Sequence, residues 1–201
     1  MLFRSSMYYI ANNPQYGATI TYYVDTVPKT DRDIRKEKEK KLFEKGEFIP
    51  QPTARELNLE ERELKPYLIF TITDEDGTVI RKLYKSASKG VGRVTWNFTH
   101  AGYQPVRSTE KFNPVSEGEG RSRWSGGGIS VMPGKYFVSM AMYAKGEVKE
   151  LTGPEPFVCK PLDIVTLPAT DAAAREKWLK EMSDFAKTAY GAISYAAELD
   201  G

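Results

Sequence analysis

Short segments in which apolar and polar side chains alternate, joined by tight turns, constrain the fold of this chain more than any other feature. Residues 67–73 alternate in this way, and residues 79–84 follow after Asp76-Gly77, where glycine allows the positive φ that a hairpin turn requires. The same period of two recurs in further segments: residues 17–24, 93–98, 135–143, 147–151 and 155–160. About seven strands at this spacing predict an antiparallel β-sandwich.

Two aromatic residues are expected in the core of this sandwich. Trp96 shares one strand face with Val94 and Phe98, and this company of large apolar residues favours burial over a ligand platform. Tyr136 stands on the same strand face as Met140 and further apolar residues. We therefore predict that both rings lie inside the sandwich.

The 201 residues suffice for one domain with additional segments. We divide them into three parts: an N-terminal arm from a preceding module (1–16), an immunoglobulin/fibronectin-III-like sandwich (17–163) and a C-terminal helix (168–201). The sandwich contains a charged helical insertion (30–64) and a Gly-rich loop (99–130). The insertion is rich in Lys and Glu, which favours a solvated helix over a docking site for a charged partner. The chain opens in a loop-like stretch, so we expect it to be a piece of a larger protein.

Composition argues against several classes of protein. With 29 basic and 27 acidic residues the formal charge is +2, so we expect no nucleic-acid partner. No apolar run reaches the roughly 18 residues that span a bilayer, and the first residues lack the apolar core of a signal peptide. Cys159 is the single cysteine, which excludes an intrachain disulfide.

Searches for catalytic and metal-binding patterns give no candidate. His100 is the single histidine, so a catalytic triad or a paired-histidine metal site has too few members. Asp74, Glu75 and Asp76 fall in one hairpin turn, where turn chemistry explains them better than calcium binding or acid–base catalysis. We expect no catalytic residue, no metal site and no cofactor.

The Gly-rich loop provides one candidate binding site. Tyr103 and Trp124, beside Arg121 and Arg123, carry side chains that stack on sugar rings or on a neighbouring protein. The alternative is that this loop folds over the end of the sandwich and buries Trp124.

The C-terminal helix provides a second candidate. Its apolar residues are spaced alternately by four and three, which is typical of a narrow packing seam: Trp178, Met182, Phe185, Ala189, Ala192, Ala196 and Leu199. We name Trp178, Met182 and Phe185 as partner-facing residues. Packing on its own domain, a partner surface and a homodimer are the alternatives.

Four stretches carry a resemblance to a known family: residues 13–24, 65–83, 92–97 and 132–136. Over most of residues 11–163 the chain resembles the C-terminal region of bacterial sortilin-like (BNR-repeat) β-propeller proteins, which are often labelled glycosyl hydrolases. That region is similar to the immunoglobulin-like module of flagellar hook-capping proteins, whose pattern is occupied here by Asp74, Gly77, Val94, Trp96, Pro133, Gly134 and Tyr136. The chain departs from that pattern at Asn97, where the module has Asp, and in its long Gly-rich insertion.

The resemblance implies a secreted or periplasmic parent protein whose propeller precedes this segment, with any hydrolytic residues outside these 201 residues. We therefore expect a non-catalytic accessory module that contacts the upstream propeller or another protein. Two alternatives stay open: a carbohydrate-binding module that uses the 99–130 loop, and part of a glycoside hydrolase whose active site lies outside this chain.

Overall fold

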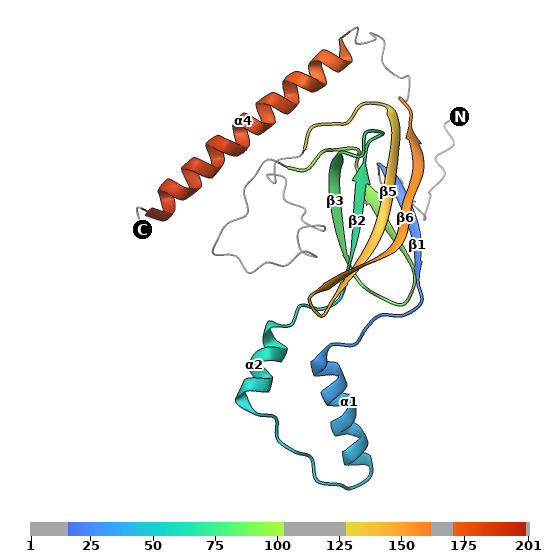
Figure 1. The fold of residues 1–201 in the computed structure, drawn as a ribbon, viewed down its shortest axis with the longest axis vertical. Helices are drawn as coiled ribbons and strands as arrows, with labels where there is room; N and C mark the ends of the chain where they lie inside the picture. Colours follow the sequence, from blue (N-terminus) through green and yellow to red (C-terminus); the bar gives the residue numbers. More distant parts are fainter. Residues whose placement is uncertain (1–15, 103–127, 162–170, 200–201) are drawn as a thin grey trace, which may run out of the picture.

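The computed structural model describes residues 16–102, 128–161 and 171–199 (Figure 1). Within these ranges the chain forms six strands in two antiparallel sheets and three helices. In chain order they are β1 (Ala18–Val24), α1 (Asp31–Glu44), α2 (Ala54–Arg62), β2 (Tyr67–Thr73), β3 (Val79–Ser86), β4 (Gly90–Trp96), β5 (Gly134–Ala144), β6 (Glu147–Cys159) and α4 (Ala172–Leu199). None of the helices in the described ranges is long and apolar enough to cross a membrane.

The strands pair in two separate sheets, which together form what we call the two-sheet body. β1 pairs with β4, and the second sheet has the order β3-β2-β5-β6. The hairpin predicted at Asp76-Gly77 is confirmed: Gly77 has a φ of +79°, and the backbone N–H groups of Asp76 and Thr78 donate to Asp74 Oδ1. Because side chains alternate between the two faces of a strand, each sheet has one face whose side chains contribute to the core.

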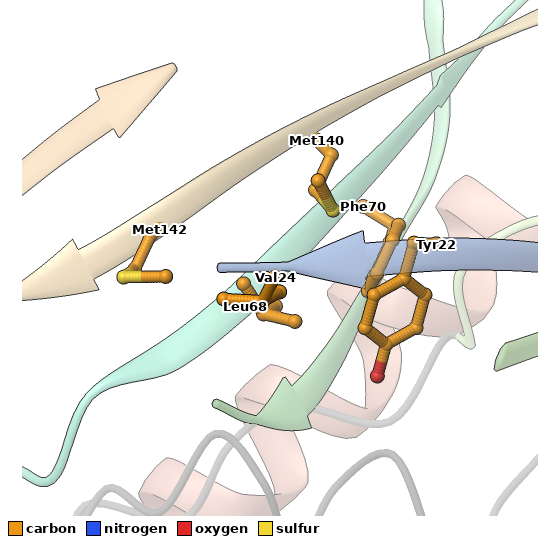
Figure 2. Packing of buried hydrophobic residues seen from close by; sticks show 6 residues of the cluster. All are labelled: Tyr22, Val24, Leu68, Phe70, Met140 and Met142. Carbon is orange, nitrogen blue, oxygen red and sulfur yellow. The ribbon is translucent and has the colours of Figure 1, made fainter. Parts of the chain in front are cut away.

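The core between the sheets is built from both of them. Figure 2 shows Tyr22 and Val24 of β1 among Leu68 and Phe70 of β2 and two methionines of β5, Met140 and Met142. The rings of Tyr22 and Phe70 lie 4.9 Å apart between centroids. Because each of these residues is nearly removed from water, burial of the cluster supplies hydrophobic free energy that holds the two sheets together.

A second core cluster surrounds Trp96, which is fully buried, as the sequence predicts. Its indole Nε1 donates to the backbone carbonyl of Thr99 at 2.9 Å, so the buried polar atom has a partner. Tyr136 is also buried, again as predicted, and its hydroxyl donates to the carbonyl of Met132 at 2.7 Å.

Two predictions about strands are wrong. Residues 147–151 and 155–160, expected as two strands, form the single edge strand β6, in which irregular pairing with β5 absorbs Gly153-Pro154. The described part therefore has six strands, one fewer than expected. The second wrong prediction placed Phe98 on the same strand as Trp96. Phe98 lies beyond the end of β4 and has a φ of +56°, although its ring still packs on Trp96.

The charged insertion contains two helices, and the sequence analysis predicted only the first. α1 and α2 project together from one end of the sheets (Figure 1). Arg35 on α1 joins Glu60 on α2 through two hydrogen bonds of 2.6 and 2.7 Å, and Lys145 in the β5–β6 turn donates to Asp31 at 2.6 Å. The Arg35–Glu60 pair joins the two helices, and the exposed Lys145–Asp31 pair links α1 to the β5–β6 turn.

Candidate functional site

The C-terminal helix leaves large apolar side chains in water. Trp178, Met182 and Phe185 are 57 %, 45 % and 69 % exposed, and Ile193 and Leu199 are 65 % and 71 % exposed. Figure 1 shows α4 as a long helix set apart from both sheets. Exposed apolar residues gathered on one element are uncommon in a monomeric protein, so this helix is a candidate interaction surface.

Trp178, Met182, Phe185 and Leu199 lie on one side of α4 because of their spacing along the sequence, which Ile193 does not share. α4 has 28 residues, rich in Ala, Lys, Glu and Leu, which favour helix. Alternate spacings of four and three keep such residues on one side of a helix. We define the apolar seam as Trp178, Met182, Phe185, Ala189, Ala192, Ala196 and Leu199.

A polar contact attaches α4 to the two-sheet body. His100 Nε2 lies 3.4 Å from Glu176 Oε1, and the same oxygen lies 3.1 Å from Lys180 Nζ. Glu176 is two residues from Trp178, a rotation of about 200° around the helix, so it points away from the seam. The contact therefore holds α4 by the side opposite the seam.

Burial determines the protonation of His100. Desolvation lowers the pKa of His100 below its ordinary value, although the hydrogen bond with Glu176 acts in the opposite direction. The imidazole is therefore neutral at pH 7, and the contact with Glu176 is a hydrogen bond between a neutral ring and a carboxylate.

Arg81, on β3, fixes the backbone that carries His100. Its Nη1 donates to the carbonyl of His100 at 3.2 Å and to the hydroxyl of Thr99, which in turn donates to Asn97 Oδ1 at 2.7 Å. Burial lowers the pKa of Arg81, but the guanidinium stays charged because its ordinary pKa is so high. This polar cluster positions His100 for its contact with α4.

A groove of about 360 Å³ opens beside two edge strands, β1 and β6. Its walls include Ile20, Phe98, Val138, Phe157 and Cys159. Burial raises the pKa of the Cys159 thiol, so the thiol is protonated at neutral pH and serves as a packing residue. Sequence analysis missed this groove because it depends on which strands lie at sheet edges.

The other predicted site residues, Tyr103, Arg121, Arg123 and Trp124, lie outside the residues that the structure describes. In the described ranges no group of three or more His, Cys, Asp or Glu side chains is arranged to hold a metal ion. The apolar seam of α4 is therefore the predicted site that lies within the described residues.

Comparisons of the chain with protein-family models, with curated proteins and with solved structures found no match.

Proposed function

We propose that this chain is a non-catalytic interaction module, an immunoglobulin-like β-sandwich that presents the apolar seam of α4 to another protein surface. The observation that carries the proposal is the exposure of the seam, with Trp178 at 57 % and Phe185 at 69 %. The two-sheet body encloses Trp96 and Phe70 without any contribution from α4 to its core clusters. A seam that the core does not need is free to bind a partner.

We further propose that the module belongs to an exported bacterial β-propeller protein and packs against neighbouring parts of it. Support comes from the places of the shared motifs in the fold. Asp74 and Gly77 form the β2–β3 turn, Gly134 begins β5, and Trp96 and Tyr136 lie in one core cluster. The motif residues Asp74, Gly77, Trp96 and Tyr136 thus occupy turn and core positions, which supports the proposal.

The stability of a seam variant tests the proposal. We compare Phe185→Glu with Ala173→Glu, which adds the same charge at an exposed position away from the seam. Measured by urea unfolding at a concentration too low for association, both variants should keep the free energy of unfolding within about 0.5 kcal/mol of the parent chain. A loss of about 2 kcal/mol or more for Phe185→Glu alone would show that the seam is packed within its own chain, which contradicts the proposal.

A further inference from the structure

The groove beside β1 and β6 lies between two strand edges that have no partner strand in the described part of the chain. β1 pairs with β4 alone, and β6 pairs with β5 alone. Both strands contribute to the walls of the groove, β1 through Ala18 and Ile20 and β6 through Phe157 and Cys159. Figure 1 shows β1 and β6 next to each other at one border of the two-sheet body. Edges of this kind are where a further strand can pair.

The size and lining of the groove suit the side chains of an added strand. The walls are mainly apolar and include Ile20, Phe98, Val138 and Phe157. An engineered apolar cavity of about 150 Å³ holds benzene, so a groove of about 360 Å³ has room for roughly two ring-sized side chains. An extended segment fits such a place, because its backbone pairs with a strand edge while alternate side chains enter the groove.

The N-terminal arm of this chain has the sequence pattern of such a strand. Over residues 3–11 one alternate set carries no charge: Phe3, Ser5, Met7, Tyr9 and Ala11. The other set contains the charged residue Arg4, together with Ser6, Tyr8 and Ile10. Aromatic and β-branched residues, which favour strands, occur in both sets. The uncharged set suits an apolar groove and the set with Arg4 suits the outer face of a sheet, so the pattern selects which side of the segment faces the groove.

A short connection joins this segment to β1. Residues 12–17 read Asn-Asn-Pro-Gln-Tyr-Gly, which are turn-forming types over a length typical of connections in compact domains, about four to six residues. Gly17 has a φ of +136°, a conformation that other residues rarely adopt. The ring of Tyr16 lies 5.5 Å from the ring of Phe98, a residue that lines the groove, so the chain enters β1 beside the groove. A strand at residues 3–11 would therefore run antiparallel to β1, along the edge that β4 does not occupy.

We infer that residues 3–11 form a further strand, which pairs antiparallel with β1 and fills the groove with the side chains of Met7, Tyr9 and Ala11. The added strand turns the two-stranded sheet of β1 and β4 into one of three strands, and three strands with an apolar face are far more stable than two. The N-terminal arm is then an integral part of the sandwich. The inference does not depend on the apolar seam of α4.

Matched charge substitutions on the whole chain test which side of the segment is buried. Tyr9→Asp places a carboxylate in the apolar groove and should lower the melting temperature by roughly 5 °C or more. Tyr8→Asp adds the same charge on the outer face and should change the melting temperature by less than about 1 °C. Equal melting temperatures, or a larger loss for Tyr8→Asp, would overturn the inference.

Disulfide cross-linking identifies the occupant of the groove without placing a charge there. Cys159 is the single cysteine of the chain and lines the groove, and it packs against the same core cluster as Ala18. Because the proposed hairpin brings position 11 beside Ala18, Ala11→Cys should form a disulfide with Cys159 of its own chain under mild oxidation. Ile10→Cys, on the outer face, should not.

Peptide mass spectrometry of the oxidised chain reads out the link. No disulfide in the Ala11→Cys variant, or equal linkage in both variants, would overturn the inference. A disulfide between two chains would mean that the groove holds the arm of a second copy, which would also overturn it.

Discussion

The ring of Trp96, on β4, packs edge-on against the ring of Tyr136, on β5, with 5.3 Å between the ring centroids. Because β4 and β5 belong to different sheets, this contact joins the two sheets at a fully buried point. Phe98 and Phe157 pack on the same indole at 5.4 and 5.9 Å. The aromatic cluster is therefore a principal element of the core.

Removing the indole should destabilise the two-sheet body strongly. Trp96→Ala leaves a large cavity and should lower the free energy of unfolding by about 3–5 kcal/mol in a urea titration. Val91→Ala on the same strand is the matched control, since Val91 is 74 % exposed, and its change should stay within about 0.5 kcal/mol. A Trp96→Ala chain as stable as the Val91→Ala control would contradict the packing described.

The burial of Tyr136 should make stability depend on pH in the alkaline range. Burial, aided by the charge of Glu176, raises the pKa of Tyr136 to about 12 from an ordinary value of 10.0. The unfolded chain then loses its tyrosine proton first, so the free energy of unfolding falls between about pH 10 and 12 and is unaffected below that range.

Tyr136→Phe checks this assignment. The variant should lose about 1 kcal/mol at neutral pH, because the carbonyl of Met132 loses its 2.7 Å hydrogen bond. Its free energy of unfolding should also fall less steeply from pH 10 to 12. The fall that remains comes from Tyr22 and Tyr67, because burial raises their pKa values too. An unchanged slope in urea titrations across this range would show that Tyr136 is not the group responsible.

Gly92 is required by the ring beside it. A Cβ atom at Gly92, on β4, would lie 2.3 Å from Cζ of Tyr22, its partner on β1. Gly92→Ala must displace this core ring and should lower the melting temperature, at a cost of about 1–3 kcal/mol. Gly153→Ala on β6, where no atom lies within 4 Å, should change stability by less than about 0.5 kcal/mol. Equal effects of the two substitutions would contradict the register of β1 with β4.

The strand segments and the core were predictable because both follow from local patterns. Alternation placed Leu68, Phe70 and Ile72 on one face, and all three are buried. The capping box at the start of α2 is equally local: Thr53 and Glu56 exchange hydrogen bonds with each other's backbone, and the Thr-x-x-Glu spacing was present in the sequence. α2 was therefore predictable and was missed.

Other features depend on contacts between residues far apart in the chain. His100 and Glu176 are 76 residues apart, and nothing near either residue indicates that they meet. The last two predicted strands form one strand, β6, because β6 lies at a sheet edge, where a bulge accommodates Gly153-Pro154. The exposure of Trp178 could likewise not be predicted, because it depends on where α4 lies relative to the two-sheet body. The spacing of the apolar residues of α4 fits packing on its own domain equally well.

The central claim is that the two-sheet body encloses Trp96 while α4 offers Trp178 to a partner. Acrylamide quenching of tryptophan fluorescence tests it directly, in a Trp124→Phe chain whose emission comes from these two residues alone. We predict one almost unquenched component, from Trp96, and one readily quenched component, from Trp178. Two protected components would contradict the account, because Trp178 would then be buried within its own chain.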